Sequence, residues 1–132
     1  KKGLELIDDK KSLLIERTKN VVIELVHYAE KYPKVNFSEY LSKELDYNYT
    51  HLANLFSEVT GTTIANYIII NKIERVKELL LYDELTLTEI SLLMEYSSVA
   101  HLSHQFKKVT GLTPTYFKNM KQYKKRIMLE EL

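Results

Sequence analysis

The chain of 132 residues contains an internal repeat, and this repeat restricts the possible folds more than any other feature. A shift of 50 residues matches apolar, histidine, threonine and glycine positions of one stretch with those of another. The matched positions are His51, Leu52, Phe56, Val59, Thr60, Gly61 and Thr63 with His101, Leu102, Phe106, Val109, Thr110, Gly111 and Thr113. Upstream the shift becomes 49, so the second copy holds one extra residue. We therefore expect two similarly packed units.

Each copy has the signals of two short helices joined by a turn. Three glycines and two prolines in the whole chain leave little room for a turn-rich β fold, so helices should dominate. Gly61 and Gly111 are expected to end the second helix of each copy, and the 86–89 segment has the spacing of a capping box. The expected helices are 36–45, capped by Asn36 or Ser38, 49–60, 86–95 and 98–110. Helix, turn, helix is thus predicted twice.

A longer helix is expected between the two copies, from Thr63 to about Asp83. It contains no glycine or proline. Some 18 to 20 residues at about 1.5 Å per residue span about 30 Å, close to the roughly 34 Å repeat of B-DNA. Two helix-turn-helix units joined in this way could enter successive major grooves. A plain helical bundle with two similar hairpins is the alternative that the pattern leaves open.

Before the repeat, the sequence predicts an amphipathic helix over 10–31, capped by Asp8 or Asp9 and ended by Tyr32-Pro33. Residues 3–7 could be a strand remnant or a frayed lead-in. Apolar positions such as Leu14, Val21, Leu25 and Tyr28 could pack on the first helix-turn-helix or mediate dimerisation. Because the chain begins with Lys1, we expect part of a longer cytosolic protein.

The residues resemble the DNA-binding domain of the AraC/XylS transcription regulators over about 36–118. The most specific string is Phe106-Lys107-Lys108, followed by Gly111, Thr113-Pro114 and an aromatic residue three positions later. The resemblance implies an all-α fold, with two helix-turn-helix units on a linker helix, and a cytoplasmic, sequence-specific regulator of bacterial type. Its partners would be double-stranded DNA, RNA polymerase and, through the N-terminal region, a second copy. The expected segments are 1–35, 36–62, 63–85, 86–118 and 119–132.

The second helix of each unit is the expected recognition helix. In the first unit Leu52, Leu55, Phe56 and Val59 should be buried, and the residues expected to face DNA are Thr50, Ala53, Asn54 and Ser57. In the second unit they are Ser98, Val99, Ala100, Ser103, His104, Lys107 and Lys108. Asn54 could bond an adenine edge with its amide, and His104 could donate to a guanine or a phosphate. The lysines suit the DNA backbone.

The net charge of +1 argues against DNA binding until it is divided by region. Segment 37–61 carries 1 basic and 4 acidic residues, 86–111 carries 2 and 2, and 112–132 carries 5 and 2. The phosphate contacts should therefore come mainly from the second unit and the basic C-terminal stretch. That stretch could also be a solvated tail. A helical interaction module with weak or no DNA binding is the alternative function.

The residues that several other functions require do not occur in the sequence. No cysteine is present, so a disulfide frame or a zinc-thiolate site is excluded. His101 and His104 have no third metal ligand at helical spacing, and we expect His51 and His101 to be partly buried in packing or hydrogen bonding. No P-loop or hydrolase motif occurs, and no apolar run could cross a bilayer. We expect neither an enzyme nor a cofactor. The resemblance implies a small residue in the turn where Glu95 stands, and a positive φ at Glu95 would cost about 1 kcal/mol.

Overall fold

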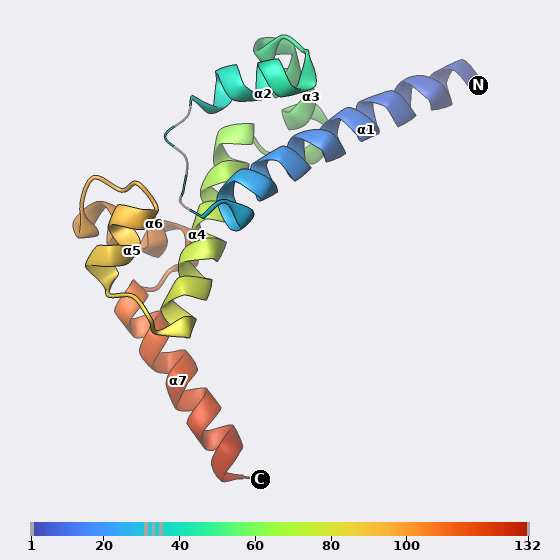
Figure 1. Cartoon of the computed structure of the whole chain (residues 1–132). Coiled ribbons are helices and arrows are strands. Elements are labelled where there is room, and N and C mark those ends of the chain that lie inside the picture. Colours follow the sequence, from blue (N-terminus) through green and yellow to red (C-terminus); the bar gives the residue numbers. More distant parts are fainter. Residues whose placement is uncertain (1, 31, 33, 35, 132) are drawn as a thin grey trace. The chain divides into compact units, whose positions relative to one another are not determined.

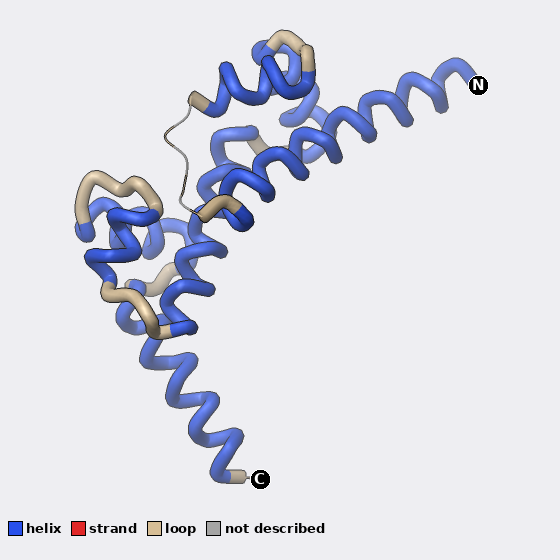
Figure 2. The backbone as a smooth tube through the Cα atoms, in the orientation of Figure 1, coloured by secondary structure: helices blue, strands red, loops and turns tan. Residues whose placement is uncertain are grey.

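The computed structural model describes residues 2–30, 32, 34 and 36–131, and this part of the chain contains helices and no strand (Figures 1 and 2). The all-α class predicted from the sequence is confirmed. The described elements are α1 Lys2–Ile23, the π-helix η1 Glu24–Tyr28, α2 Phe37–Leu45, α3 Tyr49–Thr60, α4 Ile64–Tyr82, α5 Leu87–Leu93, α6 Val99–Thr110 and α7 Pro114–Glu130. The chain divides into two compact units, residues 1–71 and 72–132, and the division falls within α4.

The first unit is built around α1, α2 and α3. Its buried cluster combines Ile15, Leu41, Leu45, Leu52, Phe56 and Ile64. Because Ile15 belongs to α1, the first helix packs on the first helix-turn-helix, as one of its two predicted roles required. At the end of η1, His27 Nε2 lies 3.0 Å from Oδ1 of Asn71 on α4. This hydrogen bond adds a polar contact within the same unit.

The second unit has its own buried residues, contributed by the second half of α4 and by the elements after it. They are Ile73, Val76, Leu79, Leu80, Ile90, Met94, Tyr96, Leu102, Phe106 and Phe117. The rings of Phe106 and Phe117 meet edge to face with their centres 5.5 Å apart. In the first unit, Phe56 and Tyr67 form the corresponding pair at the same separation. The repeat in the sequence is thus a repeat in packing.

The N-terminal helix differs from the prediction at both ends. It begins at Lys2, so residues 3–7 are helical rather than a strand remnant, and neither Asp8 nor Asp9 is a cap. Helical hydrogen bonding extends through this stretch because it contains no proline to stop it. The helix ends in the π-turn at Tyr28, three residues earlier than predicted. The predicted stop at Pro33 lies outside the described residues.

The basic segment expected over 119–132 is helical in the residues that the structure describes, because α7 continues to Glu130. Thr113 caps this helix by accepting a hydrogen bond from the backbone N–H of Tyr116 at 3.2 Å. Pro114 occupies the first turn, where its missing N–H costs nothing. The residues that follow are mostly good helix formers, with no further glycine or proline.

Burial differs from the prediction at one matched pair of the repeat. Val59 is 49% exposed and Val109 is 40% exposed, although both recur at the same position of the two units. The prediction that Val59 is buried is therefore wrong. In each helix the buried face is centred on the leucine and phenylalanine four residues apart, and the valine lies beside it. Tyr28 is likewise 78% exposed.

Candidate nucleic-acid interface

Helix α3 is held in place by a cap at each end and by two buried side chains. Asn48 Oδ1 accepts a hydrogen bond from the backbone N–H of His51 at 3.1 Å. At the other end Gly61 takes φ 77°, and its N–H donates to the carbonyl of Ser57 at 2.9 Å. The left-handed conformation of Gly61 is what makes glycine the favoured residue there. Leu52 and Phe56 anchor the helix in the core.

The opposite face of α3 carries the residues expected to read DNA. Thr50 and Asn54 are exposed, and Ser57 is half-buried. The side chains of these residues form no hydrogen bond with any described residue. Ala53 is half-buried and packs against the core cluster, so it lies at the margin of the exposed face. Glu58 is exposed beside Ser57 and makes the face partly acidic.

Helix α6 repeats this construction with a different surface. Ser98 Oγ accepts a hydrogen bond from the backbone N–H of His101 at 3.0 Å, and Gly111 ends the helix at φ 82°. The predicted cap and stop are both confirmed. Leu102 and Phe106 are completely buried and fix which side of the helix faces outward.

The outward side of α6 is basic and contains no carboxylate. Ala100, His104, Lys107 and Lys108 are exposed, while Val99 and Ser103 are half-buried. His104 and the two lysines make no ion pair or hydrogen bond through their side chains with the part of the chain that the structure describes. Lys107 and Lys108 stand at the repeat positions of Ser57 and Glu58. The two faces are thus alike in shape but differ in charge.

The turn that precedes α6 contains a group of contacts that the sequence did not predict. The hydroxyl of Tyr96 donates to Oε1 of Gln105 at 2.5 Å, and its ring meets that of His101 edge to face. Lys72 Nζ lies 3.9 Å from the centre of the same ring. Burial lowers the pKa of Lys72 to about 8, against the opposing effect of the nearby Glu95 carboxylate. In the sequence, the one sign of this cluster is an aromatic residue, Tyr96, within a predicted turn.

The histidine at position 101 behaves partly as expected. Its Nδ1 lies 3.1 Å from Oγ of Ser97, so a hydrogen-bonding role is confirmed. The expectation of partial burial is wrong, because both His101 and His51 are exposed. Each belongs to the first turn of its helix, where the buried leucine that follows takes the core position. Glu95 adopts φ 58°, which bears out the strained turn inferred from its position.

The basic stretch of the C-terminal region is ordered along α7 and only partly free. Lys118 forms an ion pair with Asp83, and Lys121 Nζ lies 5.8 Å from the centre of the Phe117 ring. Further along the helix, a surface hollow of about 450 Å³ is lined by Lys121, Lys124, Lys125, Met128 and Leu129. The lysines beyond residue 120 can therefore face an anion more readily than Lys118.

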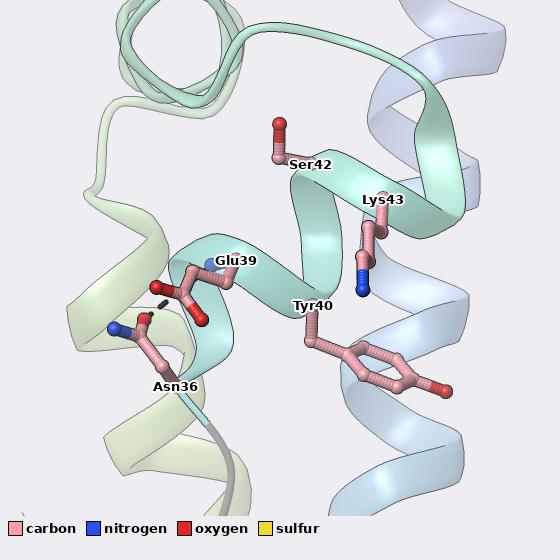
Figure 3. A pocket seen from close by; sticks show the side chains of 5 residues that line it. All are labelled: Asn36, Glu39, Tyr40, Ser42 and Lys43. Carbon is pink, nitrogen blue, oxygen red and sulfur yellow. Dashed lines mark hydrogen bonds between the residues drawn. The ribbon is translucent and has the colours of Figure 1, made fainter.

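A second hollow, of about 470 Å³, lies on α2 and is shown in Figure 3. It is lined by Asn36, Glu39, Tyr40, Ser42 and Lys43. Asn36 is occupied in capping α2, since its Oδ1 accepts from the backbone N–H of Ser38 at 3.0 Å. Among the described residues no group of three potential metal ligands occurs, and none of the described helices is both long and apolar enough to cross a membrane.

Comparison with known proteins places this geometry in a family. A family model described as a helix-turn-helix domain matches residues 41–120, more than half of the chain. The Transposon Tn10 TetD protein of Escherichia coli is 26% identical over 88 residues, which are 67% of this chain and 64% of that protein. An uncharacterized HTH-type transcriptional regulator of Staphylococcus aureus (strain MSSA476) is 29% identical over 93 residues, 70% of this chain and 12% of its relative. The chain thus spans less than two thirds of either relative.

Solved structures agree with the fold. The DNA-binding domain of AdpA, a global transcriptional factor solved in complex with a target DNA, superimposes with a TM-score of 0.69. It is 14% identical, and the match covers 83% of this chain and 94% of that one. Each of the two compact units contains one helix-turn-helix, α2 and α3 in the first and α5 and α6 in the second. The chain belongs to the helix-turn-helix domain family, as the resemblance of its sequence to the AraC/XylS regulators predicted.

Proposed function

We propose that this chain binds double-stranded DNA in a sequence-specific manner and that α6 is its principal reading element. The outward face of α6 carries the proposal, because His104, Lys107 and Lys108 are exposed there without an acidic neighbour on the helix. A histidine can donate to a guanine edge or a phosphate, and the lysines can neutralise phosphates. Ser98, Val99, Ala100 and Ser103 lie at the start of the same helix or beside its exposed face.

In this proposal α3 supports binding without dominating it. Asn54 is the one residue of its exposed face that can make two hydrogen bonds to an adenine edge, with Thr50 and Ser57 beside it and Ala53 at the margin. Glu58 repels phosphate, so the affinity contributed by this helix should be small. The lysines of α7 beyond Lys118 would add backbone contacts.

The remaining partners follow from the same proposal. α4 has 19 residues and a length of about 28 Å, which supports the engagement of two successive major grooves by the two helix-turn-helix units. We propose that the complete regulator acts on RNA polymerase in the cytoplasm, where its DNA lies. A second copy could bind through the N-terminal region, where Leu13 is 62% exposed on α1.

Selection of bound sequences from a random DNA library tests the proposal directly. An enriched motif is expected, and its affinity should fall with rising salt as phosphate contacts are lost. Titration by fluorescence anisotropy at several salt concentrations measures this slope. If no sequence is enriched, or if binding is weak and insensitive to salt, a helical protein-interaction module is the better description.

A further inference from the structure

Tyr96 contacts α6 at two successive turns of the helix. It lies in the turn between α5 and α6 and is only 6% exposed. Its hydroxyl donates to Gln105 Oε1 at 2.5 Å, and its ring meets the imidazole of His101 edge to face with centres 5.1 Å apart. His101 and Gln105 are four residues apart and lie on one side of the helix. Tyr96 therefore contacts α6 at two places one helical turn apart, and two such contacts restrict the rotation of the helix more than one would.

The ring of Tyr96 is itself held by α4. Lys72 Nζ lies 3.9 Å from the ring centre, a separation suited to a cation–π contact. Tyr96 is also hydrogen-bonded through its backbone, with its N–H donating to the carbonyl of Ser91 at 2.9 Å. The side chain that contacts α6 is thus fixed from the turn, from α5 and from α4.

The contacts with Tyr96 bear on the direction in which the reading residues point. Successive residues of an α-helix are rotated by about 100° around its axis. His104 directly precedes Gln105, and Lys108 lies one turn beyond it. Fixing α6 at His101 and Gln105 therefore limits its rotation and sets where His104 and Lys108 face.

The first unit provides an internal comparison without this arrangement. Tyr47 occupies the position that corresponds to Tyr96, because its N–H donates to the carbonyl of Ser42 at 3.2 Å as Tyr96 does to Ser91. Tyr47 is 41% exposed, however. Leu55 stands at the repeat position of Gln105 and offers no acceptor. Among the described residues, the aromatic contact between turn and recognition helix therefore occurs only in the second unit.

We infer that Tyr96 is a positioning residue that restricts the rotation left to α6 by its buried Leu102 and Phe106, and that it thereby determines how strongly the second unit discriminates between DNA sequences. The inference rests on the proposed function in one respect, namely that α6 reads DNA. It adds that Lys72 and Gln105 act through Tyr96. The first unit, which has no such contact, would adapt to its site more freely.

Two single variants, their double variant and a control test this inference on the selected DNA site and a scrambled one. Tyr96→Phe removes the hydroxyl and keeps the ring, Gln105→Leu copies the first unit, and Tyr47→Phe is the control. We expect each of the first two variants to lower the ratio of the two affinities by about three- to tenfold, the effect of one hydrogen bond. The double variant should lose little more than either single one. The salt slope should stay unchanged because no phosphate contact is removed.

Lys72 offers a rescue experiment. Lys72→Met should also lower the ratio of the two DNA affinities. Lys72→Arg keeps a cation over the ring, so its affinity ratio should stay close to that of the wild type. An unchanged affinity ratio in Tyr96→Phe, or equal losses in Tyr96→Phe and Tyr47→Phe, would overturn the inference.

Amide hydrogen exchange without DNA separates this inference from the proposed function. Tyr96→Phe should speed the exchange of α6 amides more than that of α5 and α7, while α3 stays unchanged. If the wild-type protein selects no DNA, the proposed function fails, and the exchange result alone decides whether Tyr96 positions α6. Exchange of α6 that matches the wild type would refute the positioning role.

Discussion

Phe106 and Phe117 meet edge to face with ring centres 5.5 Å apart, and this contact joins the end of α6 to the start of α7. Both side chains are buried, Phe106 completely. Edge-to-face geometry places the positive edge of one ring on the negative face of the other. The pair therefore stabilises the fold by more than the burial of its apolar surface alone. Helix α7 thereby contacts the recognition helix at Phe106, next to Gln105, which accepts the hydrogen bond from Tyr96.

Replacing Phe106 with alanine should lower the free energy of unfolding by about 3 to 5 kcal/mol, because a large cavity replaces a fully buried ring. Phe56→Ala should have a similar effect in the first unit. Urea unfolding followed by circular dichroism measures both. Val109→Ala is the matched control on α6, and its effect should be small because Val109 is 40% exposed. A loss below about 1 kcal/mol in Phe106→Ala would contradict its role as a core anchor.

Much of the fold could be predicted because its signals are local. Ser98 and Gly111 act on the ends of α6 through backbone groups within a few residues, so their positions in the sequence specify the helix. The Thr86 capping box is confirmed for the same reason: its side chain accepts from the N–H of Glu89, and the Glu89 carboxylate accepts from the N–H of Thr86.

Other features of the fold depend on contacts between residues that are far apart in the sequence. Tyr96 and Gln105 are nine residues apart, and their hydrogen bond forms only once α6 has packed. Lys72 is more distant still from Tyr96 in the sequence. The repeated valines misled the prediction because recurrence at matched positions indicates the same environment, not a buried one. For the candidate site, the sequence predicted the exposed residues of α6 but not what holds the helix.

The exposed face of α6 should be separable from stability by substitution. His104→Ala or Lys107→Ala is expected to lower DNA affinity while the helicity measured by circular dichroism stays intact, because neither side chain is buried. For Lys107→Ala the slope of affinity against salt should also decrease by about 1, as one phosphate contact is lost. Lys10→Ala on α1, also exposed, serves as the charge-matched control. Unchanged affinity in both α6 variants would remove this face from the interface.

The charge difference between the two recognition helices can be tested by reversing it. Glu58→Lys gives α3 the residue that α6 has at Lys108, and it should raise DNA affinity severalfold at low salt. The salt slope should steepen by up to about 0.9 if the new lysine reaches a phosphate. Glu58→Gln, which only removes the negative charge, should give a smaller gain. If Glu58→Lys leaves both affinity and slope unchanged, α3 does not approach the DNA backbone at this position.

A substitution in the strained turn before α6 should raise the stability of the protein. Glu95 holds φ 58°, in the left-handed region that glycine adopts without steric cost. Glu95→Gly should therefore recover up to about 1 kcal/mol of stability. Glu95→Gln removes the same charge beside Lys72 without relieving the backbone, so it isolates the electrostatic effect. A thermal midpoint that is no higher in Glu95→Gly than in Glu95→Gln would contradict the strain.

Lys72 should give the free energy of unfolding a distinctive dependence on pH. Burial lowers its pKa in the folded protein from the usual 10.5 to about 8, so above pH 8 the unfolded chain binds more protons at this site than the folded one. The free energy of unfolding should therefore rise with pH through this group, and the window from pH 8 to about 9.5 avoids most tyrosine ionisation. Below pH 8 both states are protonated and the cost of burying the charge is fully present. Urea unfolding across the window should show a flatter profile in Lys72→Met than in the wild type, and parallel profiles would show that the Lys72 amino group is not desolvated.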